Sequence, residues 1–170
     1  MSRIGPRRAC FERDGIGVVP LPCGLEAIVD VDDLDSLKPY NWRKLTTSSG
    51  HQYAHRLIYH DGHRTTILMH RAIMAPPEGM VVDHINGDGM DNRRANLRVC
   101  TQKENMRNQR MHRINQVGHK GVYLEDGRFR AQIKHEGRNI HLGLFDTANE
   151  AAAAYQGAAK ALWGEFSRAA

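Results

Sequence analysis

Polar and apolar residues alternate strictly near the C-terminal end of the chain. Residues 128–134 read Arg-Phe-Arg-Ala-Gln-Ile-Lys, and residues 139–142 alternate again after a turn at 136–137. A period of two residues is typical of a half-buried strand. Thr147 and Glu150 then have the spacing of a capping box. The helix that follows has an apolar stripe made of Ala151, Tyr155, Ala158 and Leu162. The pattern predicts an antiparallel sheet with a helix over one face.

Shorter strand patterns occur in the first half of the chain. Residues 24–31 predict a short strand. The runs at 53–59 and 64–69 are joined by Asp61-Gly62, which is a strong hairpin signal. We find no group of side chains in this part of the chain that predicts catalysis, and we expect it to be a structural support.

The middle of the chain combines two short strands, a loop and a helix. Residues 80–83 are a short apolar run, residues 86–92 are rich in turn-forming residues, and residues 96–100 are a second strand. Residues 101–104 form a second capping-box sequence, so a helix should begin there and run toward Met111. A unit this small buries little surface, so either a metal ion or packing against the preceding β-rich region must help to hold it together.

These patterns predict an α+β protein with several small parts. We expect a flexible basic arm at 1–20, a β-rich support at 21–78, a catalytic unit at 79–111, a basic linker at 112–119, and a sheet-plus-helix domain at 120–167. The last of these would hold a three-stranded antiparallel sheet and one helix.

The composition narrows the class of protein. Of 170 residues, 41% are hydrophobic and 25% are charged, which is typical of a globular chain. The three cysteines are widely spaced, which predicts neither a disulfide framework nor a thiolate zinc site. No apolar run is long enough for a membrane helix, and the N-terminal residues lack the apolar segment of a signal peptide. We therefore expect an intracellular, cytoplasmic protein without a membrane partner.

The positive charge is concentrated in the middle of the chain. The net charge is +5. Between residues 93 and 120 the basic residues are opposed only by Glu104; they are Arg93, Arg94, Arg98, Lys103, Arg107, Arg110, Arg113 and Lys120. Such a stripe favours nucleic-acid phosphate as the partner, although a solvated helix face would have the same composition.

Asp83, His84, Asn96 and Asn105 carry the residue types that phosphodiester hydrolysis needs. A carboxylate and a carboxamide oxygen are hard ligands suited to Mg²⁺ or Mn²⁺. An imidazole can accept a proton from water at neutral pH. Asn96 could accept a hydrogen bond from Nδ1 of His84 and aim Nε2 at water. Neighbours on a regular strand point to opposite faces, so the strand must end or bulge at Asp83 and His84.

The segment from Val82 to Asn105, with its Asp-His-Ile-Asn-Gly and Ala-Asn-Leu-Arg sequences, closely resembles the HNH endonucleases of phages and homing introns. The fold of that family is a ββα-metal finger. The resemblance implies that Asp83 and Asn105 are metal ligands, that His84 is the general base, and that Asn96 is the central orienting residue. Asn105 stands where other branches of the family carry histidine. We expect a phage-encoded enzyme that acts in a bacterial host.

The C-terminal part, from Lys120 to Phe166, resembles the Apetala/ethylene-response-factor DNA-binding domain of plants. The matching features are Gly121-Val122, Ala131-Gln-Ile133, Leu142-Gly143-Leu-Phe145, the alanine-rich helix with Tyr155, and Gly164. The resemblance implies that a three-stranded sheet binds double-stranded DNA in the major groove. Tyr123, Glu125 and His141 replace the base-reading residues of the plant proteins, so no target sequence carries over. The residues that we expect to contact DNA are Arg93, Arg94, Arg98, Arg107, Arg110, Arg113, Lys120, Tyr123, Arg128, Arg130, Gln132, Lys134, Asn139 and His141.

The sequence leaves three functions open. The first is a metal-dependent endonuclease, which as a monomer with one active site would nick one DNA strand. The second is a DNA-binding regulator whose metal finger is only structural. The third, a ribonuclease or tRNA-binding protein, is disfavoured because an alternating cationic ribbon suits the major groove of B-form DNA better than the narrow groove of A-form RNA.

Overall fold

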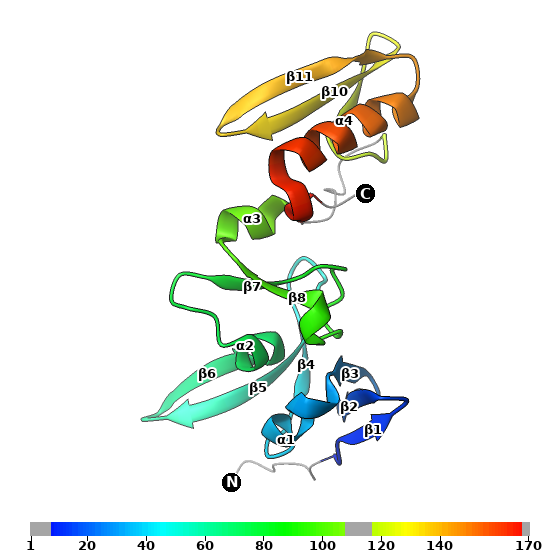
Figure 1. Ribbon diagram of the computed structural model, residues 1–170. Coiled ribbons are helices and arrows are strands. Elements are labelled where there is room, and N and C mark those ends of the chain that lie inside the picture. Colours follow the sequence, from blue (N-terminus) through cyan, green and yellow to red (C-terminus); the bar gives the residue numbers. More distant parts are fainter. Residues whose placement is uncertain (1–7, 108–116, 168–170) are drawn as a thin grey trace. The chain divides into compact units, whose positions relative to one another are not determined.

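A computed structural model describes residues 8–107 and 117–167 of the chain. The chain divides into two compact units, Met1–Gln102 and Lys103–Ala170. Both combine antiparallel strands with short helices, as the sequence predicts (Figure 1). Within the described ranges, the helices are too short or too polar to cross a bilayer. Cys10, Cys23 and Cys100 all lie within the described residues and form no disulfide bond.

Three small sheets build the first unit. The first has the order β1-β2-β3, from Phe11–Arg13, Ile16–Pro20 and Glu26–Val29; the second has the order β4-β5-β6, from Arg43–Thr46, Gln52–His60 and His63–Leu68; and the third pairs β7 (Val81–His84) with β8 (Leu97–Cys100). The helical turns are η1 (Val31–Asp33), α1 (Leu34–Leu37), α2 (Met69–Met74) and η2 (Arg94–Asn96).

The expectation of a flexible arm at 1–20 is wrong for its described second half. Strands β1 and β2 form a hairpin, because Asp14 and Gly15 both take positive φ angles, as a tight two-residue hairpin turn requires. Val18 and Val19 of β2 are buried, and β2 pairs with β3. Residues 11–20 are therefore part of the first unit.

One core joins the β-rich support and the strands β7 and β8 of the predicted catalytic unit. Val82 of β7 and Leu97 of β8 are buried together with residues of β2, β3, α1 and β5. The backbone of Asn92 donates to the carbonyl of Ile28 at 2.7 Å, which ties the loop after β7 to β3. Packing against the preceding region therefore stabilises the β7–β8 pair. This is one of the two possibilities that the sequence leaves open, the other being a bound metal ion.

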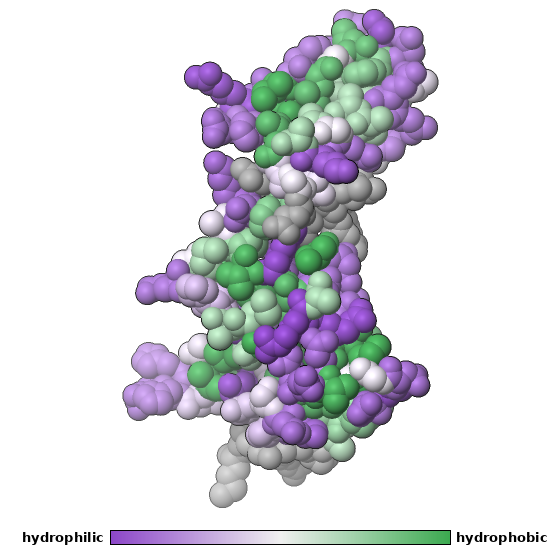
Figure 2. Space-filling view, in the orientation of Figure 1, coloured by the Kyte–Doolittle hydropathy of each residue, from purple (hydrophilic) through white to green (hydrophobic). Residues whose placement is uncertain are grey.

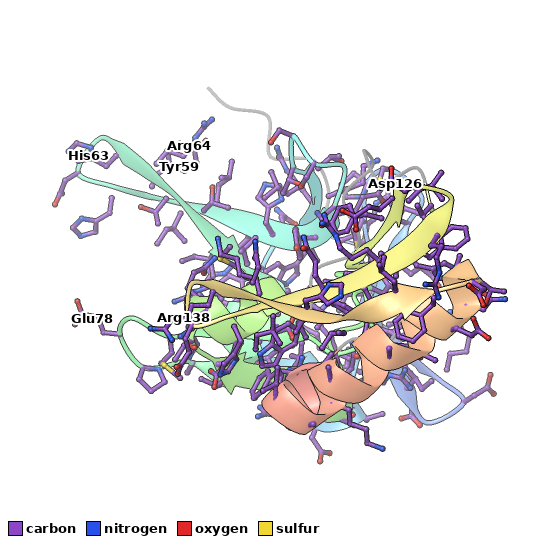
Figure 3. All side chains as sticks on the ribbon, turned by 90° about the horizontal axis from the view of Figure 1, so that it is seen from above. Tyr59, His63, Arg64, Glu78, Asp126 and Arg138 are labelled. Carbon is purple, nitrogen blue, oxygen red and sulfur yellow. The ribbon has the colours of Figure 1, made fainter. Side chains whose placement is uncertain are left out.

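The hairpin of β5 and β6 has the predicted turn. Asp61 and Gly62 have positive φ angles and connect strands that stay in register from His55 to His60. Figure 3 shows Tyr59, His63 and Arg64 on the outer part of this hairpin. Tyr59 is exposed there, whereas Ala54 and His55 at the other end of β5 are buried in the unit.

The second unit confirms the three-stranded sheet with its helix. Helix α3 (Gln102–Arg107) begins at the last residue of the first unit. The elements that follow are β9 (Val122–Glu125), β10 (Arg128–His135), β11 (Arg138–Phe145), α4 (Ala148–Trp163) and η3 (Gly164–Phe166). The strands have the order β11-β10-β9, and all pairs are antiparallel. Ala131 and Ile133 of β10 face α4, where they meet Ala151, Tyr155 and Ala159. Figure 2 shows a pale-green strip over this alanine-rich helix.

The start of α4 follows the capping-box sequence. The side chain of Thr147 accepts a hydrogen bond from the backbone of Glu150, and the side chain of Glu150 accepts one from the backbone of Thr147. One detail of β11 differs from strict alternation. A bulge at Leu142 shifts the register, so Gly143 lies opposite Ala131 while His141 lies opposite Gln132. Leu142 packs on the core, whereas Ile140, on the same face but nearer to the hairpin turn, is exposed.

Candidate active site

Strands β7 and β8 place Asp83 and His84 next to each other at the end of a short ladder. Asp83 lies opposite Arg98, and His84 lies opposite Leu97. The register is regular, so the two side chains point to opposite faces of the ribbon. Strand β7 ends at His84, as expected, but it ends without a bulge. Burial is the largest influence on the pKa of His84 and lowers it, and the negative charge of Asp83 acts in the opposite direction.

His84 is enclosed by aromatic rings from the β-rich support. Its ring lies 4.7 Å from the ring of His70 at an angle of 84°, and 5.8 Å from the ring of Tyr53. The side chain is 5% exposed. Burial lowers its pKa below the ordinary histidine value, against the opposing effects of Asn92 and three nearby carboxylates. At neutral pH the imidazole is therefore uncharged and can accept a proton.

Asn92, rather than Asn96, lies beside the His84 imidazole. The Oδ1 atom of Asn92 is 3.4 Å from Nε2 of His84. Asn92 is fully buried, and its amide donates to the carbonyl of Met90 at 3.1 Å. The turn-rich sequence around Asn92 predicts only a loop-forming role. Its contact with His84 depends on how the loop folds back over β7, and no spacing in the sequence signals that.

The expected hydrogen bond from His84 to Asn96 is wrong. Oδ1 of Asn96 accepts from the backbone of Asn86 at 3.0 Å, and its amide donates to the side chain of Asn86 at 3.0 Å and to the carbonyl of Asp91 at 2.8 Å. Asn96 therefore connects two positions of the loop that follows His84, Asn86 and Asp91, through its side-chain hydrogen bonds. It can orient the site through the loop backbone, but its side chain holds the loop and not the imidazole.

A close contact with β5 fixes the position of the same loop. A side chain at Gly89 would collide with the backbone carbonyl of Gln52 and with the ring of Tyr53. The loop therefore lies directly against the strand that supplies one of the rings around His84. Glycine is required at position 89 because it has no Cβ, which is a packing requirement and not one of backbone conformation.

Asp83 is buried and forms an ion pair with Arg98. The guanidinium donates to Oδ2 of Asp83 from Nε at 2.9 Å and from Nη2 at 2.7 Å. The side chains of Arg98 and Asp83 are 10% and 8% exposed. The sequence predicts a phosphate contact for Arg98. The structure places its guanidinium against a carboxylate inside the unit. A phosphate contact for Arg98 stays a prediction.

Two further arginines of the basic stripe are paired with carboxylates. Arg93 donates to both oxygens of Asp91, from Nε at 2.8 Å and from Nη2 at 2.7 Å. Arg94 donates to both oxygens of Asp33, from Nε at 3.0 Å and from Nη2 at 2.7 Å. Both guanidinium groups keep substantial exposure, so a DNA contact for them stays a prediction. The stripe is less cationic than the sequence suggests, because carboxylates from outside it neutralise three of its arginines.

The remaining residues of the stripe are not tested by the structure. Arg110 and Arg113 lie outside the described residues, as does the predicted continuation of the helix to Met111. Asn105 and Arg107 lie on α3. The DNA-contact role of Arg107 and the metal-ligand role of Asn105 stay predictions. Lys120 is half-buried in the second unit, just before β9.

The predicted DNA-reading residues of the second unit share one face of its sheet. Arg130 lies opposite Tyr123, Gln132 opposite His141, and Lys134 opposite Asn139. Their neighbours along β10, Ala131 and Ile133, face α4, so this set faces away from the helix. Arg130 donates to Glu125 at 2.9 Å, and Arg128 donates to Asp146 at 3.0 Å. Glu125 thus pairs across the strands and offsets part of the positive charge of the face.

The chemistry of the donor set fits a hard divalent cation. Asp83 offers a buried carboxylate and Asn105 a carboxamide oxygen, and both are oxygen ligands of the kind Mg²⁺ or Mn²⁺ prefers. Over residues 8–107 and 117–167, no three His, Cys, Asp or Glu side chains gather as a metal-binding group. An ion held here would therefore keep water or phosphate oxygens for most of its ligands, as Mg²⁺ commonly does.

His70 gives the first unit a pH-dependent stability. Burial lowers the pKa of His70 to about 3, helped by His84 and Arg71. Below pH 6.5 the His70 side chain of the unfolded chain takes up a proton that the folded ring does not accept. The contribution of His70 to the free energy of unfolding is therefore fully present above pH 6.5 and is lost as the pH falls toward 3. Because of His70, we expect the free energy of unfolding to be about 2 kcal/mol lower at pH 5 than at pH 7.

Urea unfolding at the two pH values tests this effect of His70. On acidification from pH 7 to pH 5, the free energy of unfolding of the His70→Phe variant should fall by about 2 kcal/mol less than that of the unchanged protein. His60→Phe is the matched control, because His60 is exposed on the β5–β6 hairpin and should not alter the pH dependence. Equal pH dependence in the unchanged protein and in His70→Phe would contradict the prediction.

Comparison with known proteins identifies one part of the chain. Residues 74–107 match a family model described as HNH endonuclease. The match covers β7, β8, α3 and the loop between the strands, with Asp83, His84, Asn96 and Asn105 inside it. It supports a nuclease with DNA as its substrate. No curated protein and no solved structure matches the chain.

Proposed function

We propose that this chain is a divalent-metal-dependent HNH endonuclease that hydrolyses a phosphodiester bond of double-stranded DNA. The observation that carries the proposal is the environment of His84 within the matched segment. An uncharged imidazole is held by Tyr53, His70 and Asn92. The buried carboxylate of Asp83 precedes it on β7. A base next to a metal-ligand carboxylate is the minimal equipment for hydrolysis of a phosphate ester.

Each residue then has a defined task. His84 accepts the proton of the attacking water. Asp83 and Asn105 would hold the cation. A bound Mg²⁺ or Mn²⁺ supplies charge stabilisation for the phosphate as negative charge develops on it. Asn96 and Asn92 keep the loop and the imidazole in place.

We further propose that the outer face of the β9–β10–β11 sheet binds DNA. Side chains of both types needed for groove recognition lie together there: Lys134 and Arg130 for phosphates, and Gln132, Asn139 and His141 for base edges. A three-stranded ribbon is of a size that the major groove accepts. The homing or phage setting of the enzyme rests on the resemblance alone.

We expect Lys134→Ala to weaken DNA binding and to reduce its dependence on salt. Loss of one phosphate contact should lower the slope of log affinity against log salt by about 0.9. Fluorescence anisotropy with a labelled duplex at several salt concentrations measures this slope. Lys160→Ala is the matched control, because Lys160 is an exposed lysine of the same unit on α4. Equal slopes for the two variants would contradict a DNA-binding role of the sheet face.

A plasmid assay tests the proposed activity. Supercoiled plasmid incubated with the protein and Mg²⁺ should become open circular, since one active site per chain cuts one strand. EDTA should prevent the reaction. Plasmid that stays supercoiled with Mg²⁺ and with Mn²⁺ would refute the endonuclease. If the same protein still bound DNA, that result would support the non-catalytic regulator instead.

A further inference from the structure

The carboxylate that the proposed function assigns to the metal ion already has a cationic partner. Arg98 faces Asp83 across the β7–β8 ladder, and its Nε and Nη2 both donate to the same oxygen, Oδ2. Charge-assisted contacts of this kind are strong and directional. Because neighbouring residues of two paired strands supply both partners, the backbone fixes the orientation of the Asp83 carboxylate.

The neighbouring carboxylates do not restore the lost negative charge. The charges of three carboxylates, those of Asp83, Asp88 and Asp91, act on His84 against the larger effect of its burial. Arg93 holds Asp91 and Arg98 holds Asp83. Asp88 accepts from the backbone of Met90 and forms no ion pair with the described residues. The predicted ligands, Asp83 and Asn105, together with Arg98, carry no net formal charge.

A ligand set without net charge attracts a divalent cation poorly. Affinity for such ions rises with the negative charge of the ligands, and a nearby guanidinium opposes the ion directly. Mg²⁺ is commonly held by one or two carboxylates together with phosphates of the substrate. A DNA phosphate brought to the site would supply the charge that Arg98 cancels.

We propose that Arg98 makes metal binding depend on DNA. Through its ion pair with Asp83, it keeps metal affinity low in the protein alone and lets the ion bind tightly only when a DNA phosphate joins the site. Arg98 is thus a positioning residue that orients the Asp83 carboxylate and couples the metal to the substrate. This inference rests on the proposed function, since it requires Asp83 to be a metal ligand.

Mn²⁺ binding, measured by titration calorimetry, tests the coupling without relying on cleavage. All measurements use a His84→Ala background, so that DNA stays intact. In this background we expect Mn²⁺ to bind at least about tenfold more tightly with a short duplex than without it. Arg98→Gln should raise the affinity of the protein alone about tenfold, because it removes the opposing charge. Arg98→Lys keeps a positive charge and should bind Mn²⁺ as weakly as the background protein.

Arg13→Gln is the matched control. It removes another arginine–carboxylate pair of the same unit, in which Arg13 donates to both oxygens of Glu26, and should leave Mn²⁺ affinity unchanged. Equal Mn²⁺ affinity with and without the duplex would overturn the inference, and this comparison does not require Arg98→Gln to fold. If Arg98→Gln folds, an unchanged or lower affinity for Mn²⁺ without DNA would also overturn it.

The plasmid assay separates the failure of this inference from the failure of the proposed function. Plasmid that is nicked by the unchanged protein, combined with Mn²⁺ affinity that does not respond to DNA, refutes the role of Arg98 alone. Plasmid that is never nicked refutes the endonuclease itself, and with it the premise of the inference.

Discussion

His84→Ala is expected to lower the rate of plasmid nicking about 10³-fold, within the range that a positioned general base contributes. The substitution removes the imidazole that Tyr53, His70 and Asn92 hold in place. Binding of DNA should change little, because His84 is buried and the proposed DNA-binding residues lie elsewhere. Nicking under single-turnover conditions and duplex binding by anisotropy measure the two effects separately.

His55→Ala is the matched control for His84→Ala. His55 is a buried histidine of β5 in the same unit, and its Nδ1 lies 3.1 Å from the carbonyl of Arg43. Its loss should lower thermal stability without a comparable loss of nicking. A His84→Ala protein that is folded and nicks plasmid within a few-fold of the unchanged rate would rule out His84 as the base.

The rate of nicking should also depend on pH in a direction that the burial of His84 sets. Because burial lowers the pKa of His84, the base is already deprotonated at neutral pH. The rate should therefore be insensitive to protonation of His84 near pH 7 and should fall only as the pH drops below the ordinary histidine value of 6.5. A loss of rate centred above pH 7 would point to a different group.

Asp83→Asn should lower both the rate of nicking and the stability of the protein, for two independent reasons. It removes the negative charge that would hold the cation, so we expect nicking to fall about 10²-fold or more. It also leaves the buried guanidinium of Arg98 without its charged partner, which should lower the free energy of unfolding by about 3 kcal/mol. Urea unfolding in EDTA isolates the second effect, because no metal ion then contributes to stability.

Asp33→Asn separates the two consequences. Asp33 is also buried and also receives two hydrogen bonds from an arginine, Arg94. Its substitution should lower stability, although by less, because Arg94 is more than half exposed. It should leave nicking intact in the folded protein. If Asp83→Asn and Asp33→Asn nicked plasmid equally well, Asp83 would not be a metal ligand.

The amino-acid sequence alone predicts the features that depend on neighbours along the chain. The alternation at 128–134 predicted β10 and the face that it turns to the helix. Asp61-Gly62 predicted the β5–β6 turn, and Thr147 with Glu150 predicted the start of α4. These signals act over a few residues, because side-chain period, turn conformation and helix capping are local properties of the backbone.

The pairing of charged and amide side chains, in contrast, depends on the three-dimensional fold. The sequence shows Arg94 in a basic stripe, but its partner Asp33 is 61 residues away and reaches it through the fold. Arg98 is paired with Asp83 by the register of two strands, and Asn92 reaches His84 because the loop after β7 packs on β5. Hydrogen bonds and ion pairs form through space between groups that the core brings together, so residue spacing along the chain does not reveal them.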